Sequence, residues 1–548
     1  MRDTLIANST DADCPIVRRH VKSLLIKGFK KFEKLHIDFH DRINILVGEN
    51  EAGKSTVLEA LRLVFQQTCR NSDKSILFDL FNIGQRQRFE ANPSVETLPS
   101  IHIEVLLELE DKGKDSQLFL GENHDDIFGK GEMFGIKFDC SFSQEDGAGL
   151  GEEIASGRIP VDYYKWEWKT FGDAPYSLLH PPLVFLPIDT AVQDVGSPFS
   201  RYARTLFLSC LAETPQLCKH KHDFRNGLKQ VVKDLNLPVL SDNQTFKVND
   251  KRLVLENLMA IFDGDIPLEN KGRGRESVIK MELAFARKGG TNIHVATIEE
   301  PENHLSYSNM RKMLAGILQK NTETQLIIAT HSNMIASRLD LRNVLWISDG
   351  QFGVGRLEKV DSETAQFFSK LDHNNLLDLL LAEKVILVEG ATEFLLMPKI
   401  YEAIVGRNIE ADNITVLSCN GIAYQRYFKI AETRKNRVVA ITDNDGYEER
   451  INEAWAYNAS HDFTQVFMDD NPDQWTWEQC LFDLNPDYFK KTLQVKPGAK
   501  YLYHKRDYGQ HVGYMLNNKA DVAYRLLEDN PDLVIPDYVK RAFQWLNA

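Results

Sequence analysis

The stretch RINILVGENEAGKSTVLEALRLVF, residues 42–65, decides the fold of the first part of the chain. Its run from Ile43 to Val47 predicts a buried strand, and the apolar residues after Ser55 recur at the spacing of a helix. The loop between them, from Gly48 to Ser55, fits the pattern G-x-x-x-x-G-K-[ST]. A strand, a glycine-rich loop and a helix in this order predict a binding site for nucleotide phosphates.

The residue types of this loop suit a phosphate ligand. Glycines let backbone N–H groups wrap around the phosphates, and the helix N-terminus favours an anion. Lys54 would reach the terminal phosphates of ATP, and Ser55 would ligate Mg²⁺. The predicted nucleotide-binding residues of the loop are Gly48, Asn50, Gly53, Lys54, Ser55 and Thr56.

Two later strand ends would complete a site for ATP hydrolysis. NIHVATIEEPENHL, residues 292–305, predicts a strand that ends in Glu299 and Glu300. Glu299 would hold Mg²⁺ through water, and Glu300 would polarise the attacking water. TQLIIATHSNMIAS, residues 324–337, predicts another strand, after which His331 can touch the γ-phosphate.

The long separation of these motifs predicts an insertion between two halves of one ATPase, because more than 240 residues lie between Lys54 and Glu299. With the opening VKSLLIKGFKKFEKLHIDFHDRINILVGENEAGKST, residues 21–56, the motifs resemble the ATP-binding-cassette ATPases of the SMC and RecF type. The resemblance implies a signature loop that reaches a partner's γ-phosphate across a dimer, formed here around Gly272 and Gly274. The chain departs from that pattern at Lys271, where serine is usual, and at Glu299, where most cassettes have aspartate.

A second pair of predicted strands carries a group of carboxylates. One strand ends directly before Glu389, and Glu393 follows in the first turn of the next helix. RVVAITDNDGYEE, residues 437–449, predicts another strand followed by Asp443 and Asp445, which would point the same way in extended chain. The simpler interpretation of this second stretch is a turn formed by Asp, Asn and Gly.

The strand ends favour a metal site over a simple turn. In a parallel βαβ arrangement both ends reach the same edge of the sheet, where the sites of α/β proteins are found. Four carboxylates at one place repel one another unless divalent cations bind, and their oxygens suit Mg²⁺ or Mn²⁺. Two such ions can activate water and stabilise the leaving oxygen in phosphodiester cleavage.

The motifs VEG…E and TDNDG resemble a Toprim domain. A cassette ATPase followed by Toprim resembles the OLD (overcoming lysogenization defect) family, above all its Gabija-type and retron-associated members. The resemblance implies an α/β fold with α+β elements: an ABC/SMC-like P-loop ATPase domain (1–370), which holds a mainly helical dimerisation insert at about 165–270, and then a Toprim domain (371–548).

The resemblance also implies roles for single residues of the second domain. It implies metal ligands at Glu389, Glu393, Asp443, Asp445 and Glu478. Proton transfer is a second candidate role of Glu389. Lys519 corresponds to a lysine that stabilises charge on the phosphate in the transition state. Lys500 and Lys505 are alternative candidates for that role. The simpler interpretation of Lys519 is a lysine on the exposed face of a surface helix.

The function that the resemblance implies is an ATP-regulated, metal-dependent DNA endonuclease that acts in antiphage defence. Its implied partners are DNA, further copies of the chain and, in some systems, a helicase or a retron reverse transcriptase with its RNA–DNA product. The alternative is a nucleotide-gated scaffold or sensor whose Toprim site stays silent until a partner or trigger arrives, which the net charge of −14 suits. An SMC-like repair ATPase is disfavoured because no long heptad coiled coil interrupts the chain.

Composition adds limits to these expectations. A chain of 548 residues predicts two to four domains. It has no apolar run of about 18 residues, and its start lacks the apolar core of a signal peptide, so the expected location is the cytoplasm, without a membrane partner. Its seven cysteines form no CxxC pair, which argues against a zinc ribbon and a disulfide framework.

Overall fold

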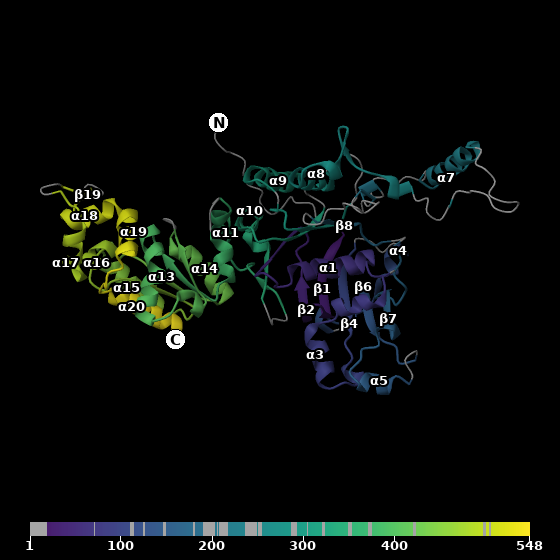
Figure 1. The fold of residues 1–548 in the computed structure, drawn as a ribbon, viewed down its shortest axis with the longest axis horizontal. Helices are drawn as coiled ribbons and strands as arrows, with labels where there is room; N and C mark the ends of the chain where they lie inside the picture. Colours follow the sequence, from purple (N-terminus) through teal and green to yellow (C-terminus); the bar gives the residue numbers. More distant parts are fainter. Residues whose placement is uncertain are drawn as a thin grey trace. The chain divides into compact units, whose positions relative to one another are not determined.

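The chain forms two compact units in the computed structural model (Figure 1). Unit 1 is the chain up to Val354 without Asp340–Arg342, and unit 2 is those three residues with Gly355–Ala548. The predicted domain boundary at 370/371 stays a prediction. The structure describes residues 19–70, 72–109, 114–123, 126–145, 149–178, 181–189, 203–204, 206–207, 217–235, 249, 255–285, 293–303, 305–320, 324–348, 353–370, 375–419, 423–496, 500–503 and 506–548.

Unit 1 contains an antiparallel sheet in the order β2-β1-β4-β6-β5, with β7 paired to β6. Its strands are β1 (His20–Phe29), β2 (Phe32–Asp38), β4 (Ile101–Glu108), β5 (Leu120–Glu122), β6 (Glu132–Phe142) and β7 (Tyr164–Thr170).

A parallel sheet in the order β13-β3-β12-β11-β8 carries the predicted phosphate loop. Its strands are β3 (Ile43–Gly48), β8 (Phe185–Asp189), β11 (Val295–Glu299), β12 (Gln325–Ala329) and β13 (Val344–Ile347). They are buried apolar runs, as strands covered on both faces are. The sequence predicts three strands here: one before the phosphate loop, one before Glu299 and one before His331. All three are present as β3, β11 and β12, and they belong to this one sheet.

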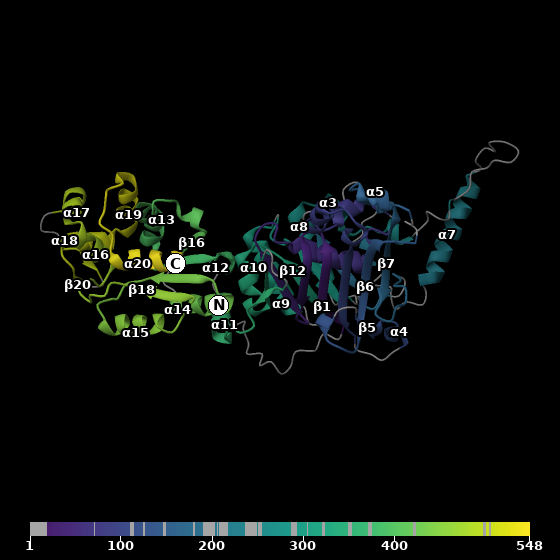
Figure 2. The same cartoon turned by 90° about the horizontal axis from the view of Figure 1, so that it is seen from below.

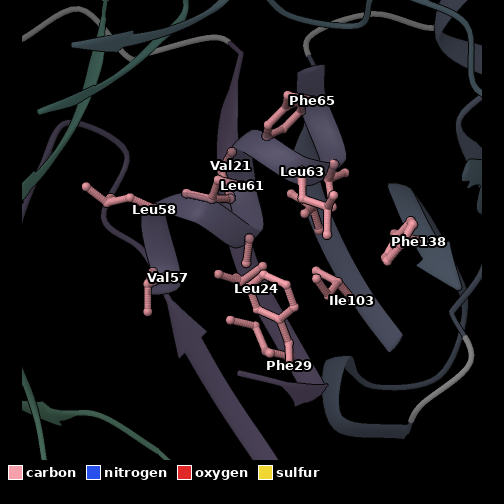
Figure 3. Close-up of a cluster of buried hydrophobic side chains, with 14 of the residues drawn as sticks. Val21, Leu24, Phe29, Val57, Leu58, Leu61, Leu63, Phe65, Ile103 and Phe138 are labelled. Atoms are coloured by element: carbon pink, nitrogen blue, oxygen red, sulfur yellow. The ribbon is translucent and has the colours of Figure 1, made fainter. Parts of the chain in front are cut away.

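Helix α1 (Lys54–Gln66) joins the two sheets of unit 1 into one core. Its apolar residues at helical spacing, Val57, Leu58, Leu61 and Phe65, are all buried, as their spacing predicts. Figure 3 shows them in one cluster with side chains of β1, β4 and β6. Each fully buried side chain of this kind contributes roughly 1.5–3 kcal/mol to the free energy of folding, so the core holds the P-loop firmly.

The other helices of unit 1 lie in the chain between these strands. They are α2 (Leu77–Leu80), α3 (Ile83–Ala91), α4 (Lys114–Gln117), α5 (Gly151–Ala155), α7 (Leu217–Asp234), α8 (Arg273–Phe285), α9 (Tyr307–Lys320) and α10 (Asn333–Arg338). The predicted dimerisation insert at about 165–270 lies partly outside the described residues. Within it, α7 is a largely exposed helix, and β9 (Phe262–Asp263) and β10 (Ile266–Pro267) form a short hairpin.

A buried charged cluster crosses the antiparallel sheet. His102 on β4 lies opposite Asp139 on β6, and its Nδ1 is 2.5 Å from Asp139 Oδ1. Its Nε2 lies 3.1 Å from Oε1 of Glu104, whose side chain is fully buried. Burial by itself lowers the pKa of His102, but the hydrogen bonds and charges of Asp139 and Glu104 outweigh burial and raise it to about 9.

Replacement of His102 by glutamine should destabilise unit 1 in a pH-dependent way. The pKa of His102 is higher in the folded state than the ordinary value near 6.5, so its stabilising effect is fully present below about pH 6.5 and is lost as the pH rises through about 9. At pH 6 the free energy of unfolding of His102→Gln should therefore be lower than that of the wild type by at most about 3 kcal/mol, and its thermal midpoint should be lower too. Calorimetry from pH 6 to 10 checks whether the gap closes, and a gap independent of pH would contradict this account.

Unit 2 contains a parallel sheet in the order β16-β15-β17-β18. Its strands are β15 (Lys384–Val388), β16 (Ile414–Ser418), β17 (Arg437–Ile441) and β18 (Thr464–Phe467), and β14 (Gly355–Arg356) precedes them. Neighbouring β15 and β17 pair Val388 with Ile441, so the predicted parallel arrangement of these two strands is confirmed.

Helices cover both faces of this sheet (Figure 2). One face packs against α13 (Ala391–Val405), α16 (Trp477–Leu484), α17 (Pro486–Thr492), α18 (Gln510–Asn517), α19 (Lys519–Asp529) and α20 (Asp537–Asn547). Helices α12 (Leu376–Leu381), α14 (Tyr424–Arg434) and α15 (Glu448–Asn458) contact the sheet outside that core, and α11 (Ser362–Ser369) precedes them. No helix in the described part of the chain has both the length and the apolar character needed to cross a membrane.

Candidate functional site

The predicted phosphate loop connects β3 to α1, and its two outer glycines cannot be replaced without strain. Gly53 has φ +104°, and a Cβ there would lie 2.3 Å from the Phe32 ring. A Cβ on Gly48 would lie 2.8 Å from the carbonyl oxygen of Ile347. The structure thus explains why this loop needs glycine at both positions.

Lys54 folds back over the loop. Its Nζ donates to the carbonyl oxygens of Gly48 and Glu49, both at 2.9 Å. Burial lowers the pKa of Lys54, while the nearby charges of Glu300 and Glu302 act against that shift. The first turn of α1 carries no acidic residue and no side-chain cap. The loop therefore presents a buried cation and a free helix N-terminus, which is the chemistry that phosphate oxygens require.

The other predicted residues of the loop lie around this cation. Asn50 and Ser55 are exposed and Thr56 is half-buried, so all three are accessible to a ligand.

Glu300 and His331 meet at the same edge of the sheet. Glu299 ends β11, and Glu300 follows with φ +44° and donates its backbone N–H to the Ala329 carbonyl at 2.8 Å. The Glu300 carboxylate accepts from Asn303 Nδ2 at 2.5 Å and lies 3.9 Å from His331 Nε2. Burial and the charge of Lys54 lower the pKa of His331, while the charges of Glu300 and Glu302 act against that shift.

Glu302 is a residue of this site that the sequence interpretation missed. Its Oε1 accepts from Thr330 Oγ1 at 2.7 Å and from the backbone N–H of His331 at 2.8 Å. Its Oε2 is buried without a hydrogen-bond partner among the described residues. Glu302 thus ties the loop after β11 to the loop after β12. Its signal was the last glutamate of IEEPE, a stretch in which only the first two acids were given roles.

The predicted signature residues open a helix, as expected. Gly272 precedes α8, and its carbonyl oxygen accepts from the N–H groups of Arg275 and Glu276 at 2.9 and 3.0 Å. Gly274 lies in the first turn of α8. Lys271, which replaces the usual serine, lies 3.1 Å from Asp263 of the β9–β10 hairpin. The structure contains one chain, so a contact across a dimer stays a prediction.

In unit 2, the ends of β15 and β17 bring Glu389 and Asp443 together. Glu389 Oε1 accepts from the Asp443 N–H at 3.2 Å and from the hydroxyl of Thr442. Glu393, in the first turn of α13, is buried, and its carboxylate is held close to Gly390, where a Cβ would lie 3.1 Å from Oε2. The predicted meeting of the two strand ends is therefore present in the structure.

A second segment completes this cluster. Asp443 accepts from the Trp477 N–H at 2.8 Å and from Thr476 Oγ1 at 2.9 Å. Thr476 Oγ1 is also 2.7 Å from Oε2 of Glu478, which is buried and whose Oε1 lies 3.0 Å from Lys519 Nζ. The Thr476 hydroxyl therefore bridges the carboxylates of Asp443 and Glu478. Thr476 had no signal in the sequence apart from its place before the helix that carries Glu478.

Electrostatics in this cluster favour a cation. Burial and then the charge of Glu478 raise the pKa of Glu393 to about 7. Burial, followed by the charges of Glu389, Glu478 and Glu393, holds the pKa of Asp443 far above its usual range. Burial by itself would lower the pKa of Lys519, but the surrounding carboxylates raise it.

The donor set of this cluster fits a hard divalent ion. Four carboxylates that repel one another, with one lysine among them, offer the oxygen ligands that Mg²⁺ and Mn²⁺ prefer. In the described part of the chain, no three His, Cys, Asp or Glu side chains already stand at ligand spacing. Binding of an ion would therefore draw these carboxylates closer together.

Asp445 does not continue an extended strand, so the expectation that it points the same way as Asp443 in extended chain is wrong, while its role as a metal ligand stays a prediction. β17 ends at Ile441, and the residues after it leave the extended conformation. Asp445 has φ +54°, and its half-exposed carboxylate forms an ion pair with Arg450 of α15. The simpler interpretation as a turn is correct from Asn444 onward, because Asn444 Oδ1 accepts from the Gly446 N–H at 2.8 Å.

The three candidate lysines differ in their surroundings. Lys519 contacts Glu478, as the resemblance implies. Lys500 is exposed, and Lys505 lies outside the described residues.

Comparisons with known proteins match both units. Residues 380–445 match the family "Overcoming lysogenization defect protein-like, TOPRIM domain", and residues 23–158 match an AAA domain. Endonuclease GajA of Bacillus cereus is 22% identical over 459 residues, which cover 77% of this chain and 74% of that protein. An ATP/GTP phosphatase of Helicobacter pylori is 21% identical over 348 residues, which cover 58% and 87%. A solved SMC head bound to the C-winged helix domain of ScpA is 15% identical with a TM-score of 0.34, and the match covers 62% of this chain and all of that one.

These matches confirm the resemblance to the OLD family that the sequence predicted. They also confirm the fold class: an α/β chain in which an ATPase domain precedes a Toprim domain.

Proposed function

We propose that this chain is an ATP-regulated DNA endonuclease that depends on a divalent metal. The observation that carries the proposal is the carboxylate cluster of Glu389, Glu393, Asp443 and Glu478 at the ends of β15 and β17, in which Glu478 contacts Lys519. The similarity to an endonuclease over three quarters of the chain supports it. So does the nucleotide-binding loop of unit 1, which gives the nuclease a means of regulation.

The residues of the cluster divide the work of phosphodiester hydrolysis. Glu389, Asp443, Glu393 and Glu478 would hold Mg²⁺ or Mn²⁺, and a bound pair of ions would supply an activated water and stabilise the leaving oxygen. Thr476 aligns two of these carboxylates through one hydroxyl, and Lys519 neutralises charge that develops on the phosphate. Asp445 joins the ligands only if Arg450 releases it.

The residues of unit 1 would bind and hydrolyse ATP. Lys54 exchanges two carbonyl oxygens for phosphate oxygens, and Ser55 and Glu299 would hold Mg²⁺. Glu300 orients the attacking water while Asn303 and His331 position its carboxylate. The ATP site and the nuclease site use different residues, so neither reaction needs the other chemically. ATP binding or hydrolysis would therefore act on DNA cleavage as a regulator.

The wider setting follows the resemblance. DNA is the proposed substrate, and a homodimer or larger homo-oligomer through the insert is the proposed assembly. A helicase or a retron reverse transcriptase with its RNA–DNA product is a further partner in some related systems, and antiphage defence is the proposed role.

A supercoiled plasmid tests the proposal directly. The purified wild-type chain should nick or linearise it with Mg²⁺ or Mn²⁺ and leave it intact with EDTA. Parallel reactions with ATP show whether the nucleotide activates or inhibits cleavage. Absence of cleavage with either metal, with and without ATP, would contradict an autonomous nuclease.

One structural observation favours the alternative of a scaffold or sensor with a silent Toprim site. No three of the described carboxylates stand at ligand spacing, and Asp445 is paired with Arg450. A partner or trigger that closes the cluster would then be needed before any DNA is cut. Measurement of Mn²⁺ binding by isothermal calorimetry separates the two, because a silent site would bind the metal weakly until the trigger is added.

A further inference from the structure

Unit 2 contains a cavity of about 430 Å³ that lies apart from the carboxylate cluster. Residues before α11, along α14 and at the end of α15 line it: Lys359, Val360, Asp361, Gln425, Phe428, Lys429, Glu432, Tyr457 and His461. Helix α15 starts just after the Asp445 turn and ends at Asn458, so its 11 residues carry the chain about 16 Å away from that turn. The Tyr457–His461 end of the cavity therefore lies toward the opposite edge of the sheet from Asp443.

One wall of the cavity is a rigid aromatic surface. The rings of Tyr457 and His461 stack at 3.8 Å with an interplanar angle of 7°, and Phe428 stacks on Tyr457 at 5.6 Å. The Tyr457 hydroxyl lies 2.8 Å from Thr464 Oγ1, which donates to Glu432 Oε1 at 2.6 Å. This chain of hydrogen bonds fixes the tyrosine ring, so the wall is formed before any ligand arrives.

Some of the polar groups around this wall have hydrogen-bond or ion-pair partners, and others have none among the described residues. Asp361 caps α11 through the Thr364 N–H at 2.9 Å and lies 3.0 Å from Lys429 Nζ. Two exposed groups, the ammonium of Lys359 and the amide of Gln425, make no hydrogen bond or ion pair with the described residues. The acids of the cavity thus have partners, whereas one cation and one amide are left for a ligand.

The histidine adds one more polar group. His461 Nδ1 lies 3.0 Å from the carbonyl oxygen of Tyr457 and 3.0 Å from the Ser460 hydroxyl. Among the described residues nothing bonds to Nε2, so this nitrogen is left for a polar group of a base, as donor or acceptor according to the tautomer.

We propose that this cavity binds a nucleotide unit, with its base against the Tyr457–His461 wall and its phosphate at Lys359. The volume lies in the range of small-molecule sites, and aromatic stacking beside a cation that no described carboxylate pairs with is the chemistry that recognises a planar base with an anionic group. Such a unit can come from a free mononucleotide or from the phosphorylated end of a DNA strand. The binding does not require the chain to be a nuclease.

Equilibrium binding of AMP to the full chain tests this inference. A Lys54→Ala background weakens binding at the P-loop, and inorganic phosphate serves as the reference ligand. AMP should bind more tightly than phosphate, and Lys359→Ala and His461→Ala should each weaken AMP binding at least about fivefold. Lys491→Ala, a change of an exposed lysine on α17 outside the cavity, should leave it unchanged, and Tyr457→Phe should retain it because the ring stays.

The outcomes separate the two sources of the ligand. Competition by a short DNA strand with a 5′-phosphate, but not by the same strand without it, identifies a strand end, and failure of both strands to compete identifies a free nucleotide. AMP binding no tighter than that of phosphate, or binding insensitive to both Lys359→Ala and His461→Ala, would overturn the proposal. Because the experiment measures AMP binding, its outcome does not depend on whether the chain cleaves DNA.

Discussion

Replacement of Asp443 by asparagine is expected to lower the rate of DNA cleavage at least about 100-fold and to leave ATP turnover unchanged. Loss of a group that only orients a metal ligand costs about 10–100-fold, and Asp443 stands at the centre of the cluster itself. It touches Glu389 through its backbone and shares Thr476 with Glu478. Plasmid cleavage and phosphate release, measured on the same preparation, check both parts of the expectation.

The Asp443→Asn variant should fold at least as well as the wild type. The pKa of Asp443 is raised because burial and three neighbouring carboxylates oppose its charge. Replacement by uncharged asparagine removes this unfavourable interaction, so the free energy of unfolding near neutral pH should not fall. Loss of ATP turnover in a folded variant would contradict the division of labour between the units.

Asp445→Asn is the matched control, because its carboxylate pairs with Arg450 and not with the cluster. A much smaller loss is expected there. A loss as large as that of Asp443→Asn would show that Arg450 releases Asp445 in the active state.

Replacement of Lys54 by alanine is expected to abolish ATP turnover, with a loss of at least about 100-fold, and to make DNA cleavage insensitive to ATP. Lys54 is the buried cation of the loop, and without it the phosphate charge has only backbone N–H groups and the helix N-terminus to oppose it. Metal-dependent cleavage without ATP should persist, since the residues of the cluster belong to unit 2. Phosphate release and plasmid cleavage across a range of ATP concentrations measure both effects.

Lys31→Ala provides the control for Lys54→Ala. The ammonium of Lys31 donates to the Glu51 carbonyl of the same loop at 2.5 Å, but it lies outside the G-x-x-x-x-G-K-[ST] pattern. It should retain most of the ATP turnover. Equal losses in the two variants would mean that general damage to the loop, rather than a lost phosphate contact, explains the result.

Features that depend on neighbours in the chain could be predicted from the sequence. Buried apolar runs predicted β3, β15 and β17, and the glycine pattern predicted the loop before α1, because strand burial and φ above zero are local demands. The meeting of Glu389 and Asp443 followed from the rule that parallel strands end at one edge.

Features that depend on distant segments could not be predicted. Asn444 Nδ2 donates to the carbonyl oxygens of Asp469 and Asn471, each at 3.0 Å, and these contacts fix the turn in which Asp445 leaves the extended conformation. Glu302 and Thr476 were missed for the same reason, since their roles are hydrogen bonds to residues far along the chain or in other elements.

The position of β3 in the middle of its sheet has a consequence for the synthesis of the protein. Ile43 pairs with Leu326, and Ile45 pairs with Val344, so both neighbours of β3 are made about 280 residues after it. At roughly 5–20 residues per second, the ribosome completes them on the order of 15–60 s later. During that interval the apolar strand has neither of its edges paired, and unpaired edges attract other chains. Translation is thus a stage at which this strand is exposed to aggregation.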